Sequence, residues 1–220
     1  MSESNIALIK SKKNALLLTA FAAVCTFLVA LTHLITAPVI EEQKQQDILR
    51  KLTQVLNKDK FDNNPLNNCV MITNSDISGV NKPTKVYRAT LNDEPYAMIF
   101  QTQTKQGYNG RIELMVAIDK RGSVQGVRTI AHQETPGLGD KIELEKSDWV
   151  LEFNNKIVRS LKDSKWFVKK DGGQFDQFTG ATITPRAIVN QLRPSVYNAT
   201  QAFEEVFALE NQCNITEAES

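Results

Sequence analysis

The feature that most constrains this chain is an apolar run near its N-terminus. Residues 14–35 (NALLLTAFAAVCTFLVALTHLI) contain no Asp, Glu, Lys or Arg. Roughly 20 helical residues span a hydrocarbon core of about 30 Å, so the run is long enough to cross a membrane. Three lysines lie within residues 10–13, whereas Glu41 and Glu42 follow the run. The positive-inside rule therefore predicts a transmembrane helix at 14–35, with residues 1–13 in the cytoplasm and the remaining chain outside.

A cleaved signal peptide is the alternative interpretation of this run. The apolar stretch is longer than the apolar region of a typical signal peptide, and no Ala-x-Ala cleavage site follows it. An uncleaved anchor is therefore favoured. Because the run carries no acidic or basic residue, this helix alone cannot conduct ions across the membrane.

The outer part of the chain is predicted to begin with a second helix. Pro38 is expected to end or kink the first one, because proline removes a helical hydrogen bond. Residues 40–57 then show apolar residues at helical spacing between charged ones, which predicts an amphipathic helix. The outer domain is expected to span 40–210, and the polar residues 211–220 are expected to form a loose tail.

Four short runs in the middle of the chain have the pattern of β-strands. They are residues 86–91, 96–102, 112–118 and 124–130. Turn signals lie at 107–110 (GYNG) and at 119–122 (DKRG), and such short connections join antiparallel neighbours. A further short strand is predicted at 166–168.

Helical patterns follow at 141–156 and at 185–209. Pro194 lies inside the second pattern and is expected to kink or divide that helix. Antiparallel strands with separate helices predict an α+β domain, built from a twisted antiparallel sheet and flanking helices.

Composition excludes several classes of function. The formal net charge is +1, so no excess of basic residues indicates nucleic-acid binding. A hydrolase is poorly supported, because His132 is the one histidine outside the apolar run and no nucleophile elbow is present. No Cys-x-x-Cys occurs, which disfavours an iron–sulfur or zinc site. Cys69 and Cys213 both lie in the outer part, where a disulfide could form, but spacing does not decide whether they pair.

One short stretch combines a turn with the start of a helix. Residues 176–185 read DQFTGATITP, with three threonines and one glycine. Pro185 suits the first helical position, and Thr184 is then expected to be the N-cap. The free N–H groups at such a helix start can hold a phosphate. The alternative is an ordinary helix cap, which is common.

A second glycine-rich loop lies at residues 132–140 (HQETPGLGD). Gly137 and Gly139 allow a tight path, and Pro136 stiffens its start. Taken alone, this loop would be an ordinary connection between a strand and a helix.

Together the two motifs resemble the bacterial FMN-binding domain family, in which a separate Mg-dependent flavin transferase esterifies the phosphate of FMN to a threonine. The resemblance of Asp-x-x-Thr-Gly-Ala-Thr-x-Thr to that family's motif implies that Thr182 is the acceptor. Spacing alone would not distinguish Thr182 from Thr179 or Thr184. The residues that the resemblance assigns to the cofactor are Asp176, Thr179, Gly180, Ala181 and Thr182 in the first motif and Glu134, Thr135, Leu138 and Gly139 in the second.

The whole arrangement is similar to the family of G-type subunits of Rnf-type ion-translocating electron-transport complexes. This similarity implies an electron-carrying subunit with covalent FMN, anchored in the bacterial inner membrane with its domain in the periplasm. Its implied partners are NADH-oxidising, iron–sulfur and polytopic membrane subunits and the flavin transferase. Such a protein is not catalytic alone, and ion transport belongs to its partners.

Two other interpretations stay open. The C-type subunits of the sodium-pumping NADH:quinone reductase share both motifs, although their chains are usually longer. An anchored domain without redox function, which binds a ligand or serves as a scaffold, is the second alternative, and the threonine turn would then only cap a helix.

Overall fold

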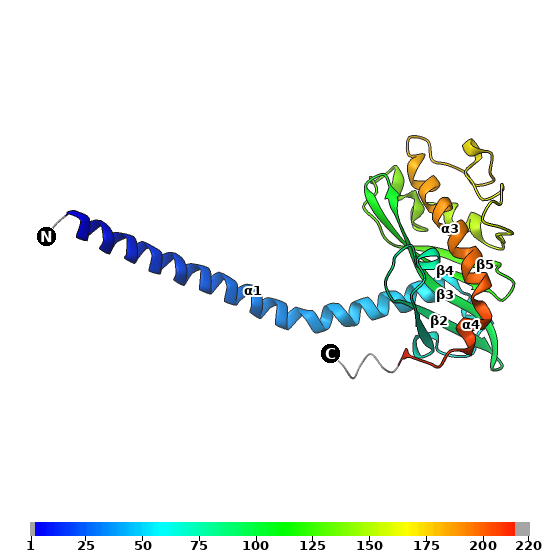
Figure 1. The fold of residues 1–220 in the computed structure, drawn as a ribbon, viewed down its shortest axis with the longest axis horizontal. Helices are drawn as coiled ribbons and strands as arrows, with labels where there is room; N and C mark the ends of the chain where they lie inside the picture. The colour runs from blue at the N-terminus through cyan, green and yellow to red at the C-terminus, as the bar shows by residue number, and fades with distance from the viewer. Residues whose placement is uncertain (1–2, 214–220) are drawn as a thin grey trace. The chain divides into compact units, whose positions relative to one another are not determined.

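The computed structural model of the chain describes residues 3–213, in two compact units that divide the chain between Ile48 and Leu49 (Figure 1). The first unit consists of most of one long helix, α1 (Glu3–Val55). Among the described residues, one stretch of helix is long and apolar enough to cross a membrane, Lys12–Ile40, with a mean hydropathy of 2.4. This stretch contains the predicted span at 14–35.

Pro38 does not end α1, contrary to one of the two outcomes expected for it. The helix continues from the apolar run into the amphipathic segment, so the predicted helices at 14–35 and 40–57 are parts of a single α1. Proline removes one backbone donor, and neighbouring hydrogen bonds keep the rest of the helix in place.

The second unit is an α+β domain built on an antiparallel sheet, as predicted. Its five strands follow one another in the order of the chain. They are β1 (Cys69–Ile72), β2 (Thr84–Leu91), β3 (Glu94–Gly107), β4 (Gly110–Asp119) and β5 (Val124–Ala131). All four predicted strands are confirmed within β2 to β5, and the turns at 107–110 and 119–122 connect them. The edge strand β1 and the short helix α2 (Ser75–Ser78) were not predicted.

The two faces of the sheet are buried by different elements. One face carries large apolar side chains, such as Phe100 and Val116, which pack against α3 (Ile183–Gln201) in the main core. On the other face, Ala117 and Gly126 are paired across β4 and β5. A Cβ atom at Gly126 would lie 2.3 Å from the Val55 carbonyl oxygen, so glycine is needed where the end of α1 crosses the sheet.

The predicted helix at 141–156 is wrong. This stretch forms two 3₁₀ helices, η3 (Gly139–Ile142) and η4 (Asp148–Phe153). Ser147 separates them, because its hydroxyl donates to the Lys141 carbonyl (2.8 Å) and accepts from the Trp149 N–H (3.2 Å). Serine at this position therefore caps a new turn and does not continue an α-helix.

The predicted strand at 166–168 is also wrong. Val168 makes a single isolated bridge to Phe175, and no strand forms there. The alternation that predicted a strand has another cause, since Trp166 and Val168 are both buried in the core. The nearby η5 (Lys169–Asp171) is a further 3₁₀ turn.

The C-terminal helix is divided, but not at Pro194, where division was one of the two expected outcomes. Pro194 lies inside α3, and the break falls at Ala202, before α4 (Phe203–Ala208). Figure 1 shows both helices along one side of the sheet.

The end of the described chain returns to the first strand. Residues 211–213 were expected to begin a loose tail, but the Gln212 N–H donates to the Cys69 carbonyl (2.8 Å). Cys69 and Cys213 form a disulfide with a Cα–Cα distance of 5.1 Å. The expected tail at 214–220 lies outside the described residues.

Candidate functional site

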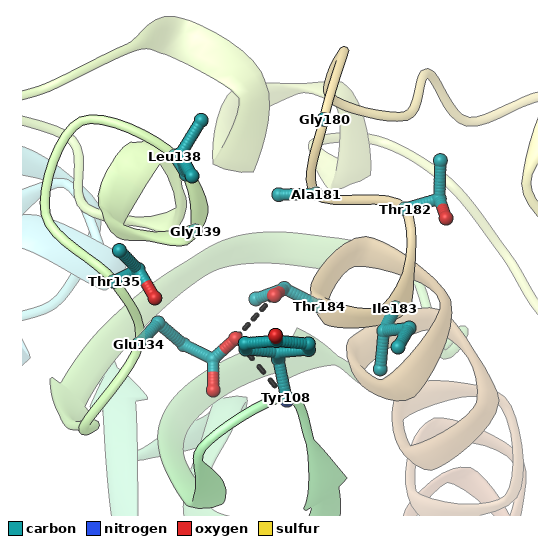
Figure 2. Close-up of a pocket in the computed structure, with 10 residues that line it drawn as sticks. All are labelled: Tyr108, Glu134, Thr135, Leu138, Gly139, Gly180, Ala181, Thr182, Ile183 and Thr184. Carbon is teal, nitrogen blue, oxygen red and sulfur yellow. Dashed lines mark hydrogen bonds between the residues drawn. The ribbon is translucent and has the colours of Figure 1, made fainter.

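A cavity of about 320 Å³ lies where three segments of the outer domain meet (Figure 2). The segments are the turn between β3 and β4, the loop after β5, and the start of α3. The residues that line the cavity are Tyr108, Glu134, Thr135, Leu138, Gly139, Gly180, Ala181, Thr182, Ile183 and Thr184. The two motifs identified in the sequence are thus brought together in the fold.

Glu134 joins the three segments. Its side chain is buried, with 4% of its surface exposed. Its carboxylate accepts hydrogen bonds from the backbone N–H groups of Tyr108 (3.3 Å) and Asn109 (3.0 Å) and from the Thr184 hydroxyl. A buried carboxylate needs such donors, because leaving it unpaired would be costly. Glu134 therefore holds the three segments that form the cavity together.

The loop after Glu134 is a tight turn. The carbonyl of Thr135 accepts from the N–H groups of Leu138 (3.1 Å) and Gly139 (3.0 Å). Pro136 and Gly137 occupy the two central positions, and the φ of +76° at Gly137 is one that glycine adopts without strain. Gly139 is needed for close packing, because a Cβ there would lie 2.8 Å from the Cβ of Glu134.

His132 fixes the backbone that enters this loop. Its Nδ1 accepts from the Glu134 N–H (3.0 Å), so Nε2 carries the proton and faces the Glu143 carboxylate at 2.8 Å. The imidazole therefore has a structural partner on each nitrogen. The His132 side chain is not among the residues that line the cavity.

The turn that precedes Thr182 is anchored in the aromatic core. The Ala181 N–H donates to the Phe178 carbonyl (3.2 Å), and Gly180 adopts a φ of +83° at the third position of this turn. The Phe178 ring packs edge to face against Trp149, with ring centroids 5.3 Å apart. The indole N–H of Trp149 donates to the Asp176 carbonyl (2.8 Å), so both ends of the segment are held.

The start of α3 differs from the prediction by two residues. Thr182 is the N-cap and Ile183 is the first helical residue, whereas Thr184 was predicted as the cap and Pro185 as the first position. The reason is that the Thr184 hydroxyl, only 1% of whose residue surface is exposed, donates to Glu134. In the described part of the chain, the hydroxyl of Thr182 makes no capping bond.

The three threonines of the motif therefore have different environments. Thr184 is buried and its hydroxyl is engaged by Glu134. Thr179 is exposed and does not line the cavity. Thr182 is half-buried, lines the cavity and keeps its hydroxyl out of the helix cap. Figure 2 shows it directly before the first turn of α3.

Seven of the nine sequence-predicted site residues line the cavity, and two do not. The Asp176 side chain is exposed and forms an ion pair with Lys169 (2.5 Å). Thr179 is exposed and is not among the residues that line the cavity. Both residues shape the segment that carries Thr182, through the Asp176 carbonyl and the turn at 178–181.

Three lining residues were not among the predicted site residues: Tyr108, Ile183 and Thr184, the last of which was expected to be the helix cap. Tyr108 lies in the turn that was correctly predicted at 107–110, but a turn residue is ordinarily exposed without any role. Ile183 breaks the polar character of its motif, and 44% of its surface is exposed. The signal available in the sequence was an apolar residue between two threonines.

The cavity combines an apolar part with a site for negative charge. Leu138, Ile183 and Tyr108 present exposed apolar surface to it. The start of α3 carries no acidic residue in its first turn and presents its free backbone N–H groups there. Such a site suits a ligand with a flat apolar ring system and an anionic end.

Two family models match the chain. Residues 107–195 match the model described as FMN-binding domain, and residues 1–55 match that described as RnfG N-terminal region. The first range contains all ten residues that line the cavity, and the second contains the whole of the apolar helix.

Similar proteins cover almost the whole chain. A protein of Shewanella piezotolerans is 45% identical over 203 residues, which is 92% of this chain and 96% of that one. Proteins of Shewanella loihica (48% identity, 86% and 90% coverage) and Vibrio cholerae (46%, 92% and 96%) are comparable. All three are named as the G-type subunit of an ion-translocating oxidoreductase complex.

One solved structure has a partly similar fold. It is the C-type subunit of the Na⁺-translocating NADH-quinone reductase from Parabacteroides distasonis, with a TM-score of 0.41 and 20% identity over 59% of this chain and 65% of that one. This similarity is too low to carry an argument about function.

Proposed function

The chain belongs to the family of G-type subunits of ion-translocating oxidoreductase complexes, and on this premise we propose that it carries electrons through FMN joined by its phosphate to Thr182. The observation that carries the choice of residue is the difference among the three threonines. Thr182 is the one of the three that lines the cavity and is not buried, and its hydroxyl makes no capping hydrogen bond at the start of α3. This supports Thr182 as the acceptor without reference to the family's motif.

The residues of the cavity fit such a cofactor. A volume of about 320 Å³ lies within the range of small-molecule sites, which begins at about 300 Å³. Leu138 and Ile183 supply apolar contact for a ring system, and the N-terminus of α3 supplies backbone donors for the phosphate. When bound, FMN would supply redox chemistry of one or two electrons, while the protein holds and tunes it.

The residues of the chain would act by positioning. Glu134 keeps the three segments together, so that the cavity has its shape before any ligand arrives. Thr135 keeps a hydroxyl near the cavity, already accepting from the Asn109 side-chain amide (3.2 Å). A covalent link at Thr182 would prevent loss of the cofactor by dissociation.

We also propose that the N-terminus faces the cytoplasm and that the outer domain lies in the periplasm of a bacterial inner membrane. The lysines before the apolar stretch and the acidic residues after it support this orientation. The disulfide between Cys69 and Cys213 supports it independently, because disulfides persist in oxidising compartments such as the periplasm.

The partners would be the other subunits of the complex. These are NADH-oxidising, iron–sulfur and polytopic membrane subunits, together with a flavin transferase for attachment of FMN. The apolar stretch at 14–35 contains no Asp, Glu, Lys or Arg, so ion transport would belong to polytopic partners.

Intact-mass measurement tests the attachment. The full chain, produced together with a flavin transferase, should gain the mass of one FMN less one water. Tandem mass spectrometry should place this mass on Thr182, and Thr182→Ala should abolish it. In-gel flavin fluorescence after denaturation gives a second reading, because only a covalent flavin remains with the chain.

Thr179→Ala is the matched control, since it removes a hydroxyl from the same turn but outside the cavity. It should keep the added mass on Thr182. An unmodified wild-type chain under these conditions would contradict the proposal and leave an anchored domain without a covalent flavin.

A further inference from the structure

Three large side chains with exposed surface converge on the cavity from three different segments. Tyr108 is 66% exposed, Leu138 43% and Ile183 44%. Soluble domains bury most such side chains, and a group of them around one cavity marks a place where a ligand covers them. Two of the three are aliphatic, and Tyr108 alone offers a flat aromatic face.

The turn that carries Tyr108 is fixed relative to the cavity, although its ring is exposed. The N–H groups of Tyr108 and Asn109 donate to the buried carboxylate of Glu134, and the Asn109 side-chain amide donates to the Thr135 hydroxyl. Hairpin turns are ordinarily mobile, but this one is fastened by three hydrogen bonds to the loop on the other side.

Glycine at position 107 makes this close approach feasible. A Cβ at Gly107 would lie 2.8 Å from the Glu134 carboxylate and 2.5 Å from the Gly110 carbonyl oxygen. Gly110 adopts a φ of +110°, which closes the turn without steric cost for glycine. The backbone that carries Tyr108 is therefore fixed at the edge of the cavity.

Figure 2 shows the Tyr108 ring on the side of the cavity away from Leu138 and Ala181. A flat ring system between them would have aliphatic contact on one face and aromatic contact on the other. Aromatic pairs favour offset stacking over a direct sandwich, so a tyrosine at the edge of the cavity is suited to this contact.

We propose that Tyr108 covers one face of the isoalloxazine ring and excludes water from it, an inference that rests on the proposed attachment of FMN at Thr182. Tyr108 then acts on the cofactor by contact and not by proton transfer. Reduced flavin carries more negative charge than oxidised flavin, so excluding water from the ring disfavours reduction. Tyr108 therefore holds the reduction potential lower than it would be in an open site.

Collisional quenching of flavin fluorescence by iodide tests this role in the full-length, flavinylated protein. Tyr108→Leu should raise the Stern–Volmer constant by about twofold or more, because the face of the isoalloxazine that the Tyr108 ring covers becomes open to iodide. Tyr108→Phe keeps a flat ring and should stay close to wild type. The midpoint potential, measured on the same samples, should become more positive in Tyr108→Leu and stay unchanged in Tyr108→Phe.

Tyr96→Leu is the control for loss of a tyrosine, since Tyr96 is half-buried near the other end of β3. Its quenching should equal that of wild type. Intact mass, read first on every sample, separates the two proposals: absence of flavin defeats the attachment at Thr182. Flavin present in all variants with equal iodide quenching in wild type and Tyr108→Leu would overturn the role of Tyr108.

Discussion

At two ends of the outer domain, a buried charged side chain joins segments that are distant in sequence, and the two charges have opposite sign. At the cavity, buried Glu134 collects two backbone N–H groups and one hydroxyl. At the C-terminal end of α4, buried Arg88 donates through Nη1 to the carbonyls of Val206 (3.2 Å) and Leu209 (2.6 Å), and through Nε to the side chain of Asn68 (2.7 Å). The Glu134 carboxylate accepts hydrogen bonds from its partners, and the Arg88 guanidinium donates hydrogen bonds to its partners.

The surroundings of the two charges differ. The Arg88 end is closed, because the disulfide between Cys69 and Cys213 fastens the chain that follows α4. The Glu134 end has no such crosslink among the described residues, and it leaves Leu138 and Ile183 exposed beside a cavity. A buried charge can thus complete a core in one place and keep a binding site in shape in another.

The largest effect is expected at the closed end. Arg88→Met should lower the free energy of unfolding by about 3 kcal/mol, because it leaves the helix-end carbonyls buried without a donor. Burial lowers the pKa of Arg88, but a guanidinium remains charged at any working pH. Urea denaturation of the full chain in detergent measures the loss.

Arg88→Lys is the comparison for this prediction. Lysine keeps the charge but lacks the planar fork of donors, so a smaller loss is expected. Amide exchange at Tyr108 and Asn109 should not change in either variant. Faster exchange there would show that the Arg88 and Glu134 ends of the domain are coupled, and it would contradict their separate roles.

A smaller effect is expected at the cavity from Gly139→Ala. The added Cβ would lie 2.8 Å from the Glu134 Cβ and 3.1 Å from the Thr184 hydroxyl. It should therefore disturb the hydrogen bonds of Glu134 and lower the free energy of unfolding by about 2 kcal/mol. Amide exchange at Tyr108 and Asn109 should become faster, since both N–H groups depend on Glu134.

Gly137→Ala is the matched control in the same loop. An added Cβ there meets no atom within 4 Å, so only the φ of +76° is strained, at about 1 kcal/mol. The amides at Tyr108 and Asn109 should exchange as in wild type. If amide exchange at Tyr108 and Asn109 were equally fast in both alanine variants, crowding at Glu134 would not be the cause of the faster exchange.

The smallest effect is a dependence of stability on pH at an ion pair between α3 and η5. Arg186 in α3 binds Asp171 of η5 through two hydrogen bonds (2.6 and 2.8 Å), which lowers the pKa of Asp171. A lowered pKa in the folded state adds stability above the ordinary value of about 4, and this contribution is lost as pH falls through the folded pKa.

Asp171→Asn tests this dependence. Wild type should be slightly more stable than the variant at pH 7, and the difference should shrink as the pH falls below about 4. Chemical denaturation at a series of pH values measures it. A difference that stays constant down to a pH of about 2 would assign the effect to something other than the charge of Asp171.

The sheet was predictable from the sequence because its signals are local. Alternating residues marked β2 to β5, and glycines at 110 and 122 adopt the positive φ that their turns require. The failures at 141–156 arose because apolar residues three apart, such as Val150 and Phe153, suit a 3₁₀ turn as well as an α-helix. Periodicity alone does not separate the two.

The cavity was predictable only in part. The motifs named seven of its residues, because each motif is contiguous in sequence and resembles a motif of the FMN-binding domain family. Tyr108 was missed because it enters the cavity through hydrogen bonds to Glu134, a residue 26 positions away. The shift of the helix cap from Thr184 to Thr182 has the same origin, since a long-range partner took the hydroxyl that local rules assigned to the cap.

The disulfide has a consequence for biogenesis. Cys69 lies in the first strand and Cys213 follows the last helix, 144 residues later. With the outer domain in the periplasm, as proposed above, the crosslink would close only after residues 69–213 had emerged on the far side of the bilayer. On that proposed topology, oxidation of this pair would report that the chain has been exported at least as far as Cys213.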